Sequence, residues 1–246
     1  MRGSAIQDNA RGIHAVSKTT LKTLRLIVPG VMTITFASLL FKSSLQDLSQ
    51  FLRSLEGLLY LVIVFPIGYL YNIMNIRGPF LRDSLSLVQA NIKGKLAAPF
   101  CAGNLIGAKV ESLTQGRQLM HVFYSIVDND ESLKSKTQDV YQNGLLWSTT
   151  ADVMAVTLFF IPVYLFAYLF KPMPHYLVVA LGLCITYLFA ALVLMPKVTS
   201  RHIELSNDQL DFILQRHPDE LYEQLLNLAS GQPVESVATP DDPKAQ

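Results

Sequence analysis

Residues 131–170 have the sequence ESLKSKTQDVYQNGLLWSTTADVMAVTLFFIPVYLFAYLF, and this stretch decides the fold. Its polar first half passes into an apolar second half with no proline at the junction, so the pattern predicts one helix that continues from water into lipid. At 1.5 Å of rise per residue such a helix is about 60 Å long, roughly twice the ~30 Å hydrocarbon core of a bilayer. We therefore expect a stalk of which about half stands outside the membrane.

The composition argues against both an ordinary soluble domain and a wholly buried transporter core. Of the 246 residues, 50% are hydrophobic and 16% are charged, so the chain is too apolar for the first class and too charged for the second. Apolar runs of spanning length also lie on both sides of the stalk. We predict an all-α, polytopic membrane protein with four transmembrane helices, near residues 24–41, 57–76, 148–170 and 176–195.

The segments around these helices define the predicted domains up to the last transmembrane helix. Residues 1–23 form a cytosolic N-terminal tail, and residues 24–76 hold transmembrane helices 1 and 2 with a short outer loop. A cytosolic helical domain at residues 77–144 is inserted between helices 2 and 3, and residues 145–195 hold helices 3 and 4. The turn between helices 3 and 4 leaves room only for a tight reversal, so we expect a hairpin.

Residues 196–246 combine a C-terminal amphipathic helix with a polar tail. Ser206 and Gln209 have the spacing of a capping box, which predicts a helix start, and Pro218 occupies a favoured first helical position for a second start. From about Gly231 the sequence is rich in Pro, Asp, Ser and Gln, a composition typical of disorder. We expect this whole region to be cytosolic.

The distribution of basic residues predicts how the chain threads the membrane. With four spans, 17 Lys and Arg residues fall on the side of the termini and the central domain, whereas only Lys42, Arg53 and Lys171 fall on the other side. Basic residues accumulate on the cytosolic side of membrane proteins. We therefore expect a multi-pass protein of the plasma (inner) membrane with both termini in the cytosol.

The one acidic residue inside a predicted span is Asp152, at the cytosolic mouth of helix 3. Thr149 and Thr150 lie beside it, so these three residues are a candidate polar mouth. Such a group can line a hydrated path, or Asp152 can pair with Arg25 or Arg77 from neighbouring helix ends. A third interpretation is an interfacial residue that reaches headgroup water.

The sequence contains no catalytic motif and no metal-binding set. G-x-S-x-G, H-E-x-x-H and a Cys or Ser close to a His are absent, so we predict no enzyme activity and no cofactor. Asp128 and Asp130 have the spacing of calcium ligands, but Leu133 and Asp139 occupy positions where an EF-hand needs Gly and Glu. We interpret Asp130 or Asn129 instead as the cap of the stalk helix. A net charge of +1 with no dense basic run argues against binding of nucleic acid.

Two functional hypotheses follow from this pattern. The first is a non-enzymatic integral membrane protein that acts through protein contacts, as a sensor, accessory, immunity, exclusion or effector subunit. Its partners would be the lipid bilayer and either further copies of itself or another membrane or cytosolic protein. The alternative is an oligomeric pore or channel, favoured by Pro66 and Pro162, which are expected to kink two of the spans, and by the repetition of Asp152 around an axis.

Overall fold

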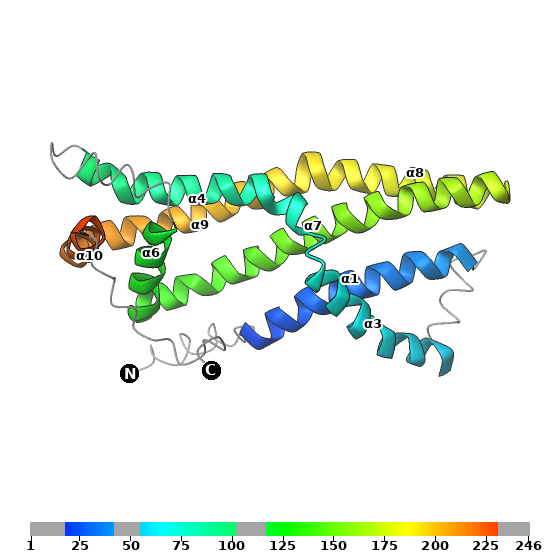
Figure 1. The fold of residues 1–246 in the computed structure, drawn as a ribbon, viewed down its shortest axis with the longest axis horizontal. Helices are drawn as coiled ribbons and strands as arrows, with labels where there is room; N and C mark the ends of the chain where they lie inside the picture. Colours follow the sequence, from blue (N-terminus) through cyan, green and yellow to red (C-terminus); the bar gives the residue numbers. More distant parts are fainter. Residues whose placement is uncertain (1–17, 42–54, 102–116, 231–246) are drawn as a thin grey trace, which may run out of the picture. The chain divides into compact units, whose positions relative to one another are not determined.

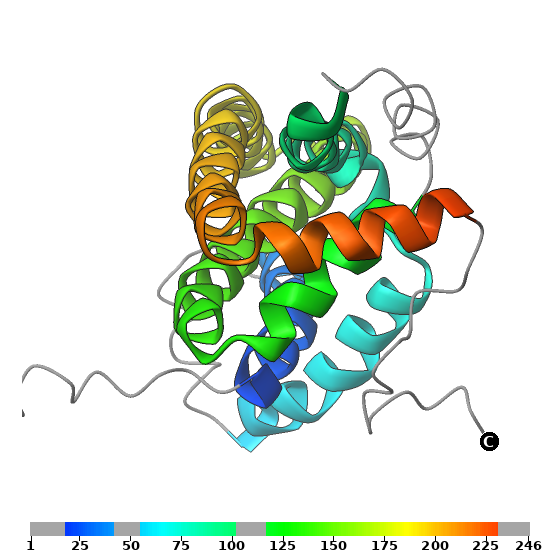
Figure 2. The same ribbon diagram turned by 90° about the vertical axis from the view of Figure 1, so that its left-hand side faces the viewer.

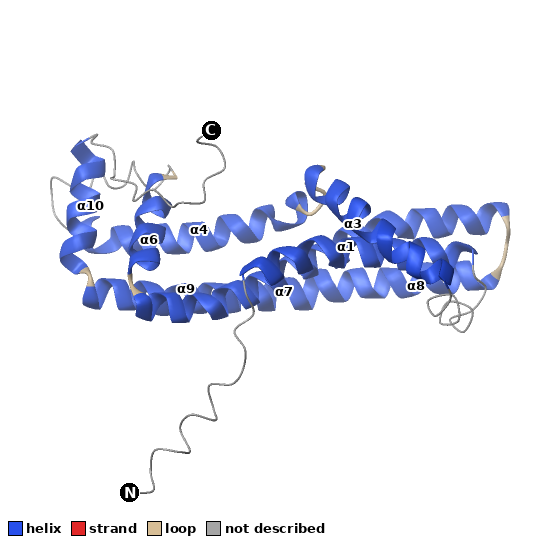
Figure 3. Ribbon diagram, turned by 90° about the horizontal axis from the view of Figure 1, so that it is seen from below, coloured by secondary structure: helices blue, strands red, loops and turns tan. Residues whose placement is uncertain are grey.

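The structure is a computed structural model that describes residues 18–41, 55–101 and 117–230. These residues are almost entirely helical and contain no strand (Figure 3), so the predicted all-α class is confirmed. The N-terminal tail up to residue 17, most of the outer loop, residues 102–116 of the predicted helical domain and the C-terminal tail from residue 231 lie outside the described residues. Predictions made for those four segments therefore stay predictions.

The helices are labelled in Figure 1. In chain order they are α1 (Lys18–Phe41), α3 (Leu55–Ile73), α4 (Gly78–Cys101), α6 (Gln118–Asn129), α7 (Glu131–Phe170), α8 (Pro174–Phe189), the π-helix η2 (Ala190–Leu194), α9 (Met195–Arg216) and α10 (Pro218–Ser230).

The chain divides into two compact units. Unit 1 consists of Met1–Phe80 and Tyr141–Met195, and unit 2 of Leu81–Val140 and Pro196–Gln246. The helix α7 therefore contributes its first ten residues to unit 2 and the remainder to unit 1.

Three helical stretches in the described residues are long and apolar enough to cross a membrane. They are Thr19–Phe41, Glu131–Phe170 and Pro174–Arg216, the last of which contains α8, η2 and α9. A shorter apolar helix covers Val62–Ile73, within α3. The protein thus has several membrane-compatible helices, and the prediction of a fourth span, which would be α3, stays a prediction.

The helix α7 is the unbroken 40-residue element that the sequence predicts (Figure 1). Asp130 caps its first turn, because its Oδ1 accepts hydrogen bonds from the backbone N–H groups of Ser132 (2.7 Å) and Leu133 (3.0 Å). The prediction of a cap at this position is therefore confirmed. Pro162 lies inside α7 and Pro66 inside α3, as their places in the sequence require.

In unit 1, α1 and α3 cross with their backbones almost touching. A methyl group added at Gly30 would collide with the carbonyl oxygen of Val64, and one added at Gly68 would collide with the carbonyl oxygen of Leu26. Each helix thus has a glycine in contact with a backbone carbonyl of the other helix. On each helix the glycine and the contacted carbonyl are four residues apart. Only a residue without a side chain allows this approach.

Two tyrosine hydroxyls hold the far half of α1 within the same unit. Tyr164 of α7 donates to the carbonyl oxygen of Phe36 at 2.7 Å, and Tyr176 of α8 donates to that of Leu40 at 3.2 Å. Tyr164 is fully buried, and its ring lies 6.3 Å from that of Tyr176 between centroids. Each buried hydroxyl therefore has an acceptor, as burial in an apolar cluster requires.

The segment from α8 to α9 is helical throughout, which differs from the predicted start at Ser206. Ser206 and Gln209 lie inside α9: the Ser206 hydroxyl donates to the carbonyl of His202, and the Gln209 side chain donates to Thr137. The capping-box prediction is wrong because helix continues through Pro196. The π turn of η2, in which the Met195 N–H donates to the Ala190 carbonyl, comes directly before this proline and widens the helix where an N–H is missing.

Unit 2 has its own hydrophobic core. Its helix α10 packs against α6 (Figure 2) and starts at Pro218, as predicted. Asn91 of α4 donates to Asn207 of α9 at 2.8 Å, and Gln209 donates to Thr137 of α7 at 3.0 Å. The most deeply buried large side chains of this unit are Leu96, Leu119, Val122, Ile126, Leu133, Leu210, Ile213, Leu221 and Leu225.

Candidate functional site

The most unusual polar feature of unit 1 is a buried carboxylate. Asp152 of α7 has a side chain that is 1% exposed, and its Oδ1 lies 3.1 Å from Nε of Arg77, whose side chain is 12% exposed. The two residues form an ion pair, so the pairing with Arg77 that was one of the sequence interpretations is confirmed. The Tyr71 hydroxyl also interacts with this carboxylate. A carboxylate with so little exposure is tolerated only beside such partners.

The turn after α3 brings Arg77 to this position. Asn75 has a backbone φ of +49°, in the left-handed region that Asn tolerates better than most residues, and it lies in the turn at residues 74–77 that separates α3 from α4. One nitrogen of Arg77, Nη2, then donates to the backbone carbonyl of Arg25 at 2.7 Å and to Oδ1 of Asn72 at 2.9 Å. Its guanidinium also lies 5.6 Å from the centre of the Tyr71 ring.

Arg25 of α1 completes what we call the charged cluster, made of Arg25, Tyr71, Arg77 and Asp152. Its guanidinium is only partly exposed and interacts with Arg77, Asp152 and Tyr141. Its Nε is buried and makes no hydrogen bond within the described residues. Its Nη2 lies against Gly144 of α7, where a methyl group would approach to 3.0 Å. The cluster therefore joins residues from α1, α3, the turn after it and α7.

The two threonines of the predicted polar mouth lie near Asp152 but have different surroundings. Thr150 is buried, and its hydroxyl donates to the Leu146 carbonyl at 2.9 Å, within α7 itself. Thr149 is partly exposed. The predicted kink residues Pro66 and Pro162 belong to α3 and α7 but to none of the contacts of the charged cluster that are described above.

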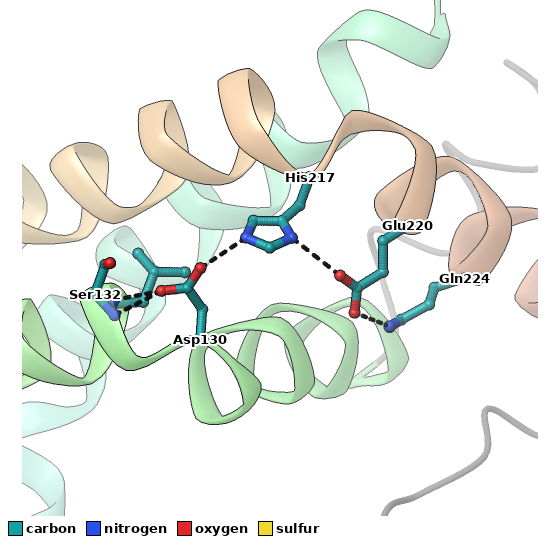
Figure 4. Close-up of polar contacts among 6 residues, drawn as sticks. Asp130, Ser132, His217, Glu220 and Gln224 are labelled. Carbon is teal, nitrogen blue, oxygen red and sulfur yellow. Dashed lines mark hydrogen bonds and ion pairs between the residues drawn. The ribbon is translucent and has the colours of Figure 1, made fainter.

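Unit 2 contains a second polar site, centred on His217. This residue lies between α9 and α10, and its Nε2 is 2.9 Å from Oδ2 of Asp130, which lies between α6 and α7. Its Nδ1 is 3.1 Å from Oε2 of Glu220, and the other oxygen of Glu220 accepts from Gln224 at 3.3 Å. Figure 4 shows the imidazole between the two carboxylates. One side chain thus connects two helix junctions.

The chemistry of this site follows from its two carboxylates. Ionised carboxylates only accept hydrogen bonds, so both contacts of His217 are hydrogen bonds when both of its ring nitrogens carry a proton. The hydrogen bond from His217, together with those from the Leu133 and Ser132 N–H groups, holds the pKa of the Asp130 carboxyl below its usual range. Both ring nitrogens contact carboxylates, so the His217 side chain links the α6–α7 junction to the α9–α10 junction.

Among the described residues, no group of three or more His, Cys, Asp or Glu side chains is placed to hold a metal ion. In the charged cluster, the Asp152 carboxylate is paired with Arg77 and also interacts with the Tyr71 hydroxyl.

Sequence reasoning missed the link at His217 and the glycine crossing of α1 and α3. The only signal for His217 is its place directly before Pro218, at a break between helices. Gly30 and Gly68 each lie within two residues of a proline in an apolar run, which is the only local signal for their crossing.

Comparison with known proteins does not identify the chain. No protein family model, no curated protein and no solved structure matches it.

Proposed function

We propose that this protein is a non-enzymatic integral membrane protein that acts through protein contacts. In this proposal the four spans of the plasma (inner) membrane are residues 24–41, 57–76, 148–170 and 176–195, which belong mainly to α1, α3, α7 and the α8–η2 segment. Unit 2 and both termini are cytosolic, and unit 2 binds a partner. The partner is a second copy of this chain or another membrane or cytosolic protein.

The observation that carries this proposal is the sharing of α7 between the two units. The helix starts at a capped junction in unit 2 and continues without a break into the apolar half that belongs to unit 1. Residues of unit 2 also have their own buried core and polar ties, so this unit has the features of a folded domain on a membrane anchor. A stable helical domain with no catalytic set supports a binding role.

The helix α10 offers a surface for such contact. Tyr222 and Leu226 lie four residues apart, on one face of the helix, and both are exposed although they are large and apolar. Aromatic and apolar residues of this kind are enriched at the centres of protein interfaces. Glu223, their exposed neighbour, provides a matched position outside this pair.

The test is affinity capture of the full chain in mild detergent after crosslinking in cells. Wild type is compared with Leu226→Glu and with the control Glu223→Gln. We expect one defined partner band that Leu226→Glu loses and the control keeps. A set of crosslinked proteins that is the same in all three samples would contradict the proposal.

The proposed topology is tested separately by cysteine labelling. Cys101 and Cys184 are first replaced by Ser, and one new cysteine is placed at Lys171, in the turn before α8, or at Glu223, in α10. An impermeant reagent applied to intact cells is expected to label position 171 only. Labelling of position 223 from outside would refute a cytosolic unit 2.

An oligomeric pore is the competing proposal, and one observation supports it: the only acid of the proposed spans lies beside two threonines on α7. In the single chain, however, Asp152 is fully buried and paired, so a conducting form would have to expose it. Conductance of purified protein in liposomes separates the two proposals. Conductance whose ion preference changes in Asp152→Asn would favour the pore, whereas sealed liposomes would favour the contact proposal.

A further inference from the structure

The charged cluster of unit 1 carries an excess positive charge. Arg77 and Asp152 form one ion pair, and the remaining bonds of Arg77 go to the Arg25 carbonyl and to Asn72. Arg25 therefore adds a second guanidinium, and within the charged cluster the two arginines share the single carboxylate of Asp152. Two partly buried guanidinium groups with one counter-ion are unfavourable, and an anion bound beside Arg25 would lower that cost.

We propose that the Arg25 guanidinium binds the phosphate group of an anionic membrane phospholipid. The inference goes beyond the proposed function and needs only that α1 and α7 cross a membrane. Arg25 precedes the most apolar part of α1, and its partner Asp152 precedes that of α7, so both lie near one end of their apolar segments. Lipid headgroups are concentrated at this depth.

The local geometry suits a phosphate. Among the described residues the buried Nε of Arg25 has no hydrogen-bond partner, while the residue as a whole is partly exposed, so the guanidinium has an unused donor next to its exposed part. A guanidinium offers two parallel N–H groups to two phosphate oxygens and is more weakly hydrated than an ammonium group. Gly144 leaves room for the guanidinium against α7, because any larger residue would press on its Nη2.

A lipid is favoured over a soluble anion by the surroundings. Many exposed side chains of unit 1 are large and apolar, among them Ile73, Met74 and Leu146, and in a membrane they would contact acyl chains. A phospholipid carries a phosphate next to two apolar chains, which matches a guanidinium next to exposed apolar side chains. A free phosphate would satisfy only the charged part.

The experiment is native mass spectrometry of the full chain released from detergent containing equal amounts of phosphatidylglycerol and phosphatidylcholine. We expect wild type to retain phosphatidylglycerol in preference to phosphatidylcholine. Arg25→Gln should lower this preference about tenfold, the size expected for loss of a charge-assisted contact. Lys22→Gln is the control, because Lys22 has the same charge on an exposed part of α1, three residues away.

A second variant keeps the test decisive if Arg25→Gln does not fold. Gly144→Ala retains every charge and pushes only on the guanidinium, so it should also lower the preference for phosphatidylglycerol. A wild-type protein with no preference, or a preference that survives both variants, would overturn the proposal. Displacement of the lipid by an excess of inorganic phosphate would overturn the lipid assignment and leave a site for a soluble anion.

Discussion

Two polar contacts of similar length, each made by a carboxylate, lie in very different surroundings in the two units. The Arg77–Asp152 contact of unit 1 measures 3.1 Å, and its side chains are 12% and 1% exposed. The His217–Asp130 contact of unit 2 measures 2.9 Å, and its side chains are 25% and 20% exposed. Distance alone therefore does not tell which of the two contacts contributes more to stability. Removing one member of the first pair leaves a charge away from water, whereas removing one of the second leaves a group that water can reach.

The comparison also separates two roles for a carboxylate. Asp152 compensates the positive charge of arginines that come from other segments of unit 1. Asp130 uses one oxygen to cap α7 and the other to contact His217, so its main role is to define a helix junction. The first role is electrostatic and the second is conformational.

The largest expected effect is that of Asp152→Ala. The variant leaves Arg77 and Arg25 without a carboxylate and should lose about 3–5 kcal/mol of unfolding free energy. Unfolding in mixed micelles of rising SDS fraction measures it. The double variant Asp152→Leu with Arg77→Met should be more stable than Asp152→Ala, because neither member of the pair is left with an unpaired charge. If the loss of unfolding free energy in the double variant equals the sum of the losses in Asp152→Leu and Arg77→Met, the pair is not coupled.

Val140→Pro should have the next largest effect, because Val140 is the last residue of α7 assigned to unit 2. The proline removes a backbone hydrogen bond and clashes with the preceding turn, at a local cost of about 3 kcal/mol or more. Hydrogen exchange should show lost protection around residue 140. Val140→Ala is the control, and equal protection in both variants would contradict a continuous helix.

Gly68→Ala should weaken the packing next to the charged cluster. Its methyl group meets the Leu26 carbonyl, so α1 and α3 must separate, at a cost of about 1–3 kcal/mol. Gly182→Ala is the matched control on α8, where the new methyl group meets nothing within 4 Å. The same SDS titration should find the control neutral or slightly stabilised. Equal losses in the two variants would argue against the backbone crossing.

A smaller effect is expected from acid at Asp130. Its pKa is lower in the folded protein than in the unfolded chain, so its contribution is complete above the unfolded value of about 3.9 and is lost as the pH falls through the lower folded value. Protection of the Ser132 and Leu133 amides should therefore decrease at acid pH below about 4. His217→Gln removes the largest cause of the shift and should move this loss to higher pH. An unchanged profile would exclude the link.

The smallest effect is expected for Arg201→Ala. Arg201 and Glu204 form a pair at 3.0 Å on α9, but their side chains are 60% and 59% exposed. Water and salt screen such a pair, so its loss should change unfolding free energy by about 0.5 kcal/mol or less. Chemical unfolding of the full chain measures it. A loss as large as that of Asp152→Ala would show that exposure does not decide the ranking.

Local sequence patterns predicted the helices of this fold better than the contacts between them. The course of α7 and its cap at Asp130 follow from neighbouring residues, because helix propensity and capping act over a few positions. The start predicted at Ser206 was wrong because a capping-box spacing also occurs inside a longer helix. Nothing within a few residues distinguishes the two cases.

The contacts between segments far apart in the sequence could not be predicted without the three-dimensional structure. The sequence left Arg25 and Arg77 as alternative partners for Asp152. In the structure Arg77, which follows the turn at Asn75, forms the ion pair, and the Arg77 side chain also donates a hydrogen bond to the Arg25 carbonyl. The link between His217 and Asp130 joins residues 87 positions apart. Periodicity reports which face of a helix is apolar but not which other helix meets it.

The crossing of α1 and α3 has a consequence for sequence variation over evolutionary time. Because backbone meets backbone there, no compensating change in a partner side chain can accommodate a larger residue at Gly30 or Gly68. These two positions should stay glycine in descendants of this gene even where the surrounding apolar letters drift. Gly94 and Gly182, which border open space, should vary freely. The difference in variation between these two pairs of glycines would then reveal the backbone contact of α1 and α3.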